Sequence, residues 1–316
     1  MNFSHQPVLL EETLELLHVD KDKIYIDGTV GGGGHSSEIL KRLEGTGLLI
    51  GIDQDDEALK KSQNVLSLID DNFKLFKSNY RDFEVILNSL NITKVDGILL
   101  DLGVSSHQFD EGKRGFSYRF DAPLDMRMDE NASLSAYDIV NSYSERQLFE
   151  VIKNYGEEKW ASRIAKFIVT RRKQQPIETT FHLVEVIKDA IPASARRKGP
   201  HPAKRTFQAI RIETNQELDV LRQSIGKFIQ YLNPGGRLCI ISFHSLEDRI
   251  VKEAFKYAFK ECICPANSPI CTCDKRREVN ILTRKPVVAS EAELRENNRA
   301  HSAKLRAVEK LEVEHS

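Results

Sequence analysis

The chain has 316 residues, of which 40% are hydrophobic and 29% charged, with a formal net charge of −1. This length fits one large or two moderate domains with a substantial core. No apolar run reaches the ~18–20 residues of a membrane span, and the first residues lack the pattern of a signal peptide. Four of the five cysteines lie within twelve residues, which does not fit a secreted disulfide framework. We therefore expect a cytoplasmic protein.

Short apolar runs alternate with helical patterns in the N-terminal third of the chain. The runs are rich in Ile, Leu and Val and span 24–27, 47–53, 73–77 and 95–102. The helical patterns between them span 36–43, 55–68 and 82–90. Such alternation is typical of a doubly wound α/β sheet, whose buried parallel strands are almost continuously hydrophobic.

The turn after the first predicted strand carries four consecutive glycines. This strand ends at Asp27, and Gly31–Gly34 follow; the second strand ends at Asp53. Glycines at such a turn let the backbone approach a ligand that a Cβ would block. A carboxylate about 20 residues further on can accept hydrogen bonds from ribose hydroxyls. These features predict a nucleoside-cofactor site, the alternative for Asp53 being a cap on the next helix.

Polar or aromatic residues also follow the next two predicted strands. Tyr80 comes after the third strand and Asp101 ends the fourth. Open α/β sheets bind ligands at the carboxyl edge of their strands. We therefore expect Asp101 to face the ligand and Tyr80 to stack near its base, the alternative for Tyr80 being a core aromatic.

The cofactor pattern favours S-adenosylmethionine over a dinucleotide. An NAD site usually has a tighter Gly-x-Gly-x-x-Gly, and Ser36 stands where the last glycine would be. The segment 232–238, Leu-Asn-Pro-Gly-Gly-Arg-Leu, joins a predicted helix to a strand, as in many class I methyltransferases. A final strand within 303–311 fits the antiparallel strand with which those enzymes end. We predict a Rossmann-like class I methyltransferase fold.

The strand and helix alternation is interrupted by a long insertion. It stops after 95–103 and resumes near Thr214, and the intervening patterns are mostly helical. We therefore assign residues 1–105 and 212–316 to the cofactor-binding domain. Residues 106–211 form an inserted helical domain, which we expect to recognise the substrate.

Positive charge is concentrated within the insertion. Residues 159–211 contain thirteen Lys and Arg against three acidic residues, a net charge of +10. An excess of positive charge over such a length favours a surface that binds phosphate groups over an ordinary solvated helix face. The candidate phosphate contacts are Arg171, Arg172, Lys173, Arg196, Arg197, Lys198, Lys204 and Arg205.

The cysteine cluster has the pattern C-x-C, six residues, C-x-C. Its members are Cys262, Cys264, Cys271 and Cys273. Four thiolates can bind zinc tetrahedrally, although C-x-x-C is the commoner spacing in structural sites. The alternative is a set of free thiols in a surface loop. We consider a structural zinc site without a catalytic role.

Several longer motifs make the chain resemble the ribosomal RNA small subunit methyltransferase H family, also called MraW, nearly from end to end. They span 5–12, 25–36, 96–106, 114–117, 123–129, 206–212 and 242–249. The resemblance implies transfer of a methyl group from S-adenosylmethionine to the exocyclic N4 of a cytidine in the decoding (P-site) region of 16S rRNA, in the small ribosomal subunit. It implies neither a membrane nor a DNA partner. The cofactor residues it implies are Gly33, Gly34, His35, Asp53, Tyr80, Asp101 and Gln108.

We place Asp101 also at the catalytic centre. Acceptors that hydrogen-bond the target amine would favour transfer as charge develops on its nitrogen. Asp101 and the following carbonyls are the candidates, with Ser105, Ser106 or His107 nearby. The alternation in Asp125, Arg127 and Asp129 predicts either a salt-bridged loop or a lid. His244, Glu247 and Asp248 follow the fifth strand and are further candidates, with Ser245 as a helix cap.

Three other functions remain open from the sequence. A methyltransferase of the same class could act on another RNA or on protein. A non-enzymatic ribosome-assembly factor could retain the fold and bind RNA. An NAD-dependent oxidoreductase fits less well because of the glycine spacing. Binding of S-adenosylmethionine separates an enzyme from a scaffold.

Overall fold

The computed structural model describes residues 7–104, 112–197, 199–265 and 270–312. The chain divides into two compact units, each continuous in space. The first contains Met1–Gly103 and Leu218–Ser316, and the second contains Val104–Glu217. The substrate-recognition role predicted for residues 106–211 stays a prediction.

The first unit is built on one seven-stranded sheet with the order β3-β2-β1-β4-β5-β7-β6. Its strands are β1 (Ile24–Asp27), β2 (Leu48–Asp53), β3 (Phe73–Lys77), β4 (Val95–Asp101), β5 (Leu232–Ser242), β6 (Val279–Ile281) and β7 (Lys304–Lys310). The first five strands pair in parallel, whereas β7 runs antiparallel to both β5 and β6. The predicted doubly wound sheet with an antiparallel C-terminal strand is thereby confirmed.

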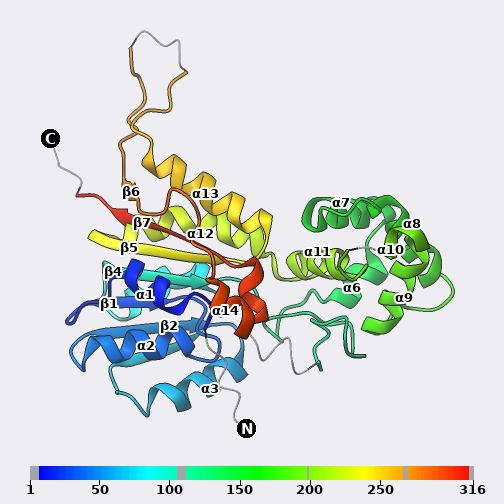
Figure 1. The fold of residues 1–316 in the computed structure, drawn as a ribbon, viewed down its shortest axis with the longest axis horizontal. Helices are drawn as coiled ribbons and strands as arrows, with labels where there is room; N and C mark the ends of the chain where they lie inside the picture. The colour runs from blue at the N-terminus through cyan, green and yellow to red at the C-terminus, as the bar shows by residue number, and fades with distance from the viewer. Residues whose placement is uncertain (1–6, 105–111, 198, 266–269, 313–316) are drawn as a thin grey trace. The chain divides into compact units, whose positions relative to one another are not determined.

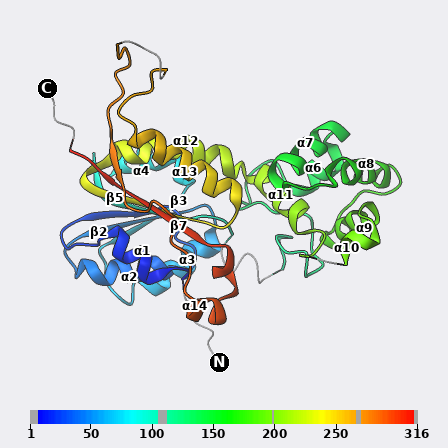
Figure 2. The same ribbon diagram turned by 45° about the horizontal axis from the view of Figure 1, so that its top comes forward.

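Helices cover both faces of this sheet (Figures 1 and 2), with α1, α2 and α3 on one face and α4, α12 and α13 on the other. The elements of this unit are α1 (Leu10–Leu17), α2 (Gly34–Leu43), α3 (Asp56–Leu66), the 3-10 helix η1 (Tyr80–Asp82), α4 (Phe83–Ser89), α12 (Glu217–Tyr231), α13 (Ser245–Phe259), α14 (Glu291–Glu296) and η2 (Asn298–Ser302). Burial of apolar side chains on both faces explains why the central strands are so hydrophobic. In β4, for example, Ile98, Leu99 and Leu100 are all fully buried.

The Asn-Pro-Gly-Gly segment, which the sequence pattern places at the end of a helix, lies instead at the start of a strand. Helix α12 ends at Tyr231 and β5 begins at Leu232. The pairing of β4 with β5 shifts register between Val95 and Gly97. Asn233 bridges this irregularity, because its side-chain amide donates to Asp96 Oδ1 at 2.9 Å.

The second unit is mostly helical, as expected. It contains α6 (Ala136–Ser142), α7 (Glu145–Gly156), α8 (Ala161–Arg172), α9 (Thr180–Ala190), α10 (Ala193–Arg196) and α11 (Lys204–Asn215). Its own hydrophobic core includes Leu148, Ile164, Ile187 and Ile210, all fully buried. Among the helices that the structure describes in either unit, none has the length and apolar character needed to cross a membrane.

Candidate cofactor site

The glycine turn is held by the carboxylate at the end of β2. Gly31 and Gly33 have φ angles of +52° and +80°, a region that L-residues with a side chain rarely adopt. Asp53 Oδ2 accepts the Gly31 N–H at 2.8 Å, and Oδ1 accepts the Asp55 N–H at 3.0 Å. The cap of α3 is Asp55, which accepts from the Glu57 N–H. Asp53 therefore connects two loops at the carboxyl edge of the sheet.

His35 is buried in the first turn of α2 and is 5% exposed. Its Nε2 lies 3.1 Å from the carbonyl oxygen of Val8, which can only accept, so we assign the ring hydrogen to Nε2. Burial lowers the pKa of His35 to about 4, which keeps the ring neutral. Its other nitrogen, Nδ1, is 3.7 Å from Asp101 Oδ2. His35 thus contacts Asp101 from inside the protein.

Asp101 is a carboxyl at this edge whose pKa is strongly perturbed. Its backbone N–H donates to Thr29 Oγ1 at 2.6 Å, which fixes the end of β4 against the glycine turn. The side chain is 28% exposed, yet its Oδ1 atom is buried and has no hydrogen-bond partner. Burial, followed by the charges of Asp27 and Glu247, raises the pKa of Asp101 to about 8; Arg299 opposes this rise.

Asp27 is a member of this group that we did not predict as a site residue. It ends β1 and is 1% exposed, accepting from the Thr29 N–H at 3.1 Å and from Ser36 Oγ at 2.6 Å. Burial raises its pKa to about 6. Three neighbouring parallel strands therefore each end in a carboxyl group. The signal was present in the sequence, because the first predicted strand ends at Asp27 as the second ends at Asp53.

Tyr80 lies at the same edge, but its ring packs into the core. The side chain is 9% exposed, and its ring centroid lies 6.2 Å from that of Phe228 on α12. A Cβ on Gly28 would approach Tyr80 Cβ to 3.2 Å, so this glycine is needed for the close packing. These contacts favour the core-aromatic alternative for the ring. Gln108, together with Ser105, Ser106 and His107, lies outside the described residues.

Comparison with known proteins agrees with this architecture. The family model described as the MraW methylase family matches residues 2–311. The chain belongs to this family. It is 55% identical over 311 residues to the ribosomal RNA small subunit methyltransferase H of Clostridioides difficile, covering 98% of this chain and 100% of that protein. A protein of the same name from Acetivibrio thermocellus is 57% identical over 313 residues, with 98% and 100% covered.

Solved structures with a similar fold include a putative rRNA-methylase from Clostridium thermocellum. Its sequence identity is 11% and its TM-score 0.47, with 98% of this chain and 100% of that chain covered. The family membership identifies the chain as a methyltransferase.

The residues after β5 form a helix cap in this member of the family. His244, and not Ser245, is the N-cap of α13, and it forms a capping box with Glu247. Asp248 binds Arg306 at 2.6 Å and Lys304 at 3.3 Å, which ties α13 to β7. Asp248 therefore has a structural role here, whereas the charge of Glu247 acts on Asp101.

In the second unit, the 123–129 motif forms a salt-bridged loop. Arg127 binds both carboxylate oxygens of Asp125, at 2.8 and 2.7 Å, and also donates to the carbonyl of Ala132. Arg114 donates to the carbonyls of Arg127 and Met128. These contacts favour the salt-bridged loop over the lid.

The basic residues of this unit divide into internal and exposed sets. Arg172, one of the candidate phosphate contacts, is half-buried and donates to the carbonyls of Val140 and Tyr143. Arg211, also counted in the basic segment, binds Glu217 at 2.9 Å through two nitrogens. The exposed ones are Lys159, Arg163, Lys166, Arg171, Lys173, Lys188, Arg196, Arg197, Lys204 and Arg205. Lys198 lies outside the described residues.

Proposed function

We propose that the chain transfers a methyl group from S-adenosylmethionine to the exocyclic N4 of a cytidine in the decoding (P-site) region of 16S rRNA, within the small ribosomal subunit. The family and the names of its relatives support an rRNA methyltransferase acting in the cytoplasm. The observation that carries the proposal is the buried, unpartnered Oδ1 of Asp101 beside the glycine turn.

The residues at this edge fit a cationic nucleoside. Asp53 is our candidate acceptor for the ribose hydroxyls, and the turn through Gly33 and Gly34 would bring backbone close to the ligand. Asp101 and Asp27 are carboxyl groups kept partly protonated by burial, and each gains from a positive charge nearby. Gln108 and His35 complete the proposed set, His35 acting through its contact with Asp101. Tyr80 stays a predicted member of the set, although its ring packs against Phe228.

The bound S-adenosylmethionine would supply an already activated methyl group on a sulfonium. The protein then has to align the amine with that carbon and exclude water. Asp101 is our candidate acceptor for an N–H of the target amine, and its ionised carboxylate accepts more strongly than the neutral acid does. With a pKa near 8, Asp101 is mostly neutral in the free protein at pH 7. A cation bound beside it lowers that pKa and so favours the ionised form, which is the stronger acceptor.

The second unit supplies the surface proposed to hold the RNA backbone. Its exposed lysines and arginines lie on α8, α9, α10 and α11 and in the segments that flank these helices. Phosphate contacts of this kind release counterions, so the affinity for RNA should fall steeply with salt. The target cytidine must leave any base stack before its amine reaches the donor.

A comparison of methylation and RNA binding in the variant Asp101→Ala tests the proposed role. We expect methyl transfer to small subunits to fall by about 10²-fold or more, as for loss of a transition-state hydrogen bond, with RNA affinity unchanged. Equal losses in both would contradict the assignment. Absence of S-adenosylmethionine binding by the wild-type chain would instead support a non-enzymatic assembly factor, and methylation of protein or of another RNA would support the other alternative.

A further inference from the structure

The loop between α13 and β6 extends away from the sheet of the first unit (Figure 1) and contains four cysteines. We call residues 260–278 the cysteine arm. Cys262 and Cys264 lie on its outgoing segment, and Cys271 and Cys273 lie on its returning segment. Among the residues that the structure describes, the contacts of these thiols join the cysteines to one another within the arm. The arm therefore needs an explanation of its own.

Apolar packing does not explain how the outer part of the arm is held together. Ile263 and Ile270 stand beside the cysteines and are 47% and 73% exposed. Nearer its base, the arm is fixed to α13 by cation–π contacts: Arg277 lies 4.0 Å from the ring centroid of Phe259, and Lys275 lies 5.1 Å from that of Tyr257. Within its described part, the cysteines join the two segments further out.

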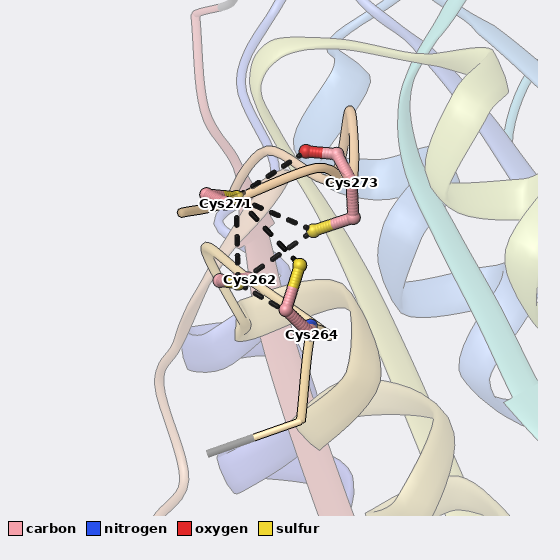
Figure 3. A group of neighbouring side chains, drawn as sticks. All are labelled: Cys262, Cys264, Cys271 and Cys273. Atoms are coloured by element: carbon pink, nitrogen blue, oxygen red, sulfur yellow. Dashed lines mark hydrogen bonds between the residues drawn. The ribbon is translucent and has the colours of Figure 1, made fainter. Parts of the chain in front are cut away.

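The four sulfur atoms face one another at the spacing of a tetrahedral thiolate site (Figure 3). Cys262 Sγ is 3.6 Å from the sulfurs of both Cys271 and Cys273, and Cys271 Sγ is 3.7 Å from Cys273 Sγ and 3.9 Å from Cys264 Sγ. All four sulfurs lie within 4.8 Å of one another. Zinc–sulfur bonds of about 2.3 Å in a tetrahedron place the sulfurs about 3.8 Å apart.

Backbone N–H groups also point at these sulfurs. The amide of Ile263 donates to Cys273 Sγ at 3.3 Å, and that of Cys264 donates to Cys262 Sγ at 3.3 Å. The amide of Thr272 donates to Cys264 Sγ at 3.4 Å. Such donors stabilise negative charge on sulfur, and second-sphere hydrogen bonds of this kind orient metal ligands.

We propose that the cysteine arm binds one structural zinc ion through Cys262, Cys264, Cys271 and Cys273. Four sulfurs at similar mutual distances fit one central ion better than two disulfides, which would form two close pairs. Four thiolate ligands complete the tetrahedral coordination shell of the ion and leave no open position for substrate, so the ion has no catalytic role. Its role is to join the two segments of the arm, independently of methyl transfer.

Metal analysis of the purified full-length protein is the direct test. We expect about one zinc ion per chain, as one tetrahedral site requires. Cys262→Ser and Cys271→Ser should each lose most of this zinc. Ile263→Ser is the matched control, because it also introduces serine between two ligands, keeps the backbone N–H, and should retain the metal. Growth with cobalt should give the absorption of a tetrahedral cobalt–thiolate centre, which the cysteine variants lack.

A second measurement uses only wild-type protein, so its result does not depend on whether the cysteine variants fold. Removal of the ion from wild-type protein should increase proteolysis within 260–278 while leaving the main thermal transition and S-adenosylmethionine binding unchanged. The proposal is overturned by wild-type protein without zinc, by iron in its place, by two disulfides among the four cysteines, or by Cys→Ser variants that keep their zinc.

Discussion

At the scale of single residues, the central feature is a carboxyl group whose ionisation is opposed by its surroundings. Burial of the Asp101 carboxyl opposes its ionisation, and the negative charges of Asp27 and Glu247 oppose it further. Natural proteins retain such an arrangement where function requires it, because active sites commonly sacrifice stability. Two predictions follow from the same pKa of about 8.

Asp101→Asn should stabilise the cofactor-free protein at alkaline pH. An aspartate in an unfolded chain has a pKa of about 3.9. Because the folded-state pKa is higher, ionising Asp101 costs no stability below about pH 4, an increasing amount as the pH rises to about 8, and a constant amount above. If the variant recovers only 1 kcal/mol of this cost, its Tm at pH 8 rises by about 2–4 °C.

Thermal unfolding at pH 4, 6 and 8 measures this difference. Asp71→Asn serves as the control, since Asp71 is an exposed carboxylate of the same unit. An equal gain in Tm at all three pH values would show that ionisation of Asp101 does not lower the stability of the folded protein. A gain as large in the control would show the same.

Binding of S-adenosylmethionine should strengthen as the pH rises from 6 toward 8. If the cation binds the ionised carboxylate, binding releases one proton, and the affinity rises up to about tenfold per pH unit. Asp27, with a pKa of about 6, and Glu247 and Arg299 also act on this site, so the Asp101→Asn variant is needed to isolate the effect. Calorimetric titration should give weak binding with a flatter pH profile in this variant; an unchanged profile would exclude Asp101.

At the scale of elements, the strands were predictable because parallel strands buried on both faces are short, continuous apolar runs. The predicted starts and ends of β1 and β3 agree with the structure. Helices without cap signals were harder. Helix α1 begins after Leu9, which has a φ of +54° and no side-chain cap, and α2 follows Gly33, also without one. Neither helix start is marked by a side-chain cap in the sequence.

The site was predictable to the extent that it follows from strand ends. A carboxylate that ends a parallel strand lies at the carboxyl edge, which located Asp53 and Asp101. The packing of Tyr80 against Phe228 and the contact of His35 with Val8 were not predictable, because each joins different elements. The same holds for Arg172, whose carbonyl partners lie outside its own helix.

Two glycines in one turn should respond differently to the same substitution. A Cβ on Gly33 would require a side chain at a φ of +80° and would approach Ser62 Cβ to 3.2 Å. On Gly32 it would meet only the Lys61 side chain, at an ordinary 3.5 Å. Gly33→Ala should therefore destabilise the protein by about 1–2 kcal/mol, the cost of a left-handed conformation, and weaken cofactor binding. Denaturant unfolding should show a smaller loss for Gly32→Ala, and equal losses would contradict this account.

At the scale of the whole molecule, we assign two tasks to two units. The sheet unit carries the proposed cofactor residues, and the helical unit carries the exposed basic residues. If the division is correct, changes in the second unit should affect RNA binding without affecting the cofactor.

The double variant Arg196→Ala/Arg197→Ala should weaken RNA binding and leave S-adenosylmethionine binding unchanged. Each lost phosphate contact reduces the slope of log affinity against log salt by about 1. Arg284→Ala/Lys285→Ala removes two adjacent exposed cations from the sheet unit and is the matched control. Affinities for rRNA measured at several salt concentrations decide the matter, and equal slopes in both double variants would refute a special role for the helical unit.

We propose that the site at Asp101 directs methylation of one cytidine amine in small-subunit rRNA. The most direct measurement is transfer of a labelled methyl group from S-adenosylmethionine to small ribosomal subunits that lack the modification, followed by mapping of the labelled nucleoside. The account predicts N4-methylated cytidine in the decoding region of 16S rRNA with the wild-type protein and almost none with Asp101→Ala. Label in a different nucleoside, in protein, or at the same level with the variant would contradict it.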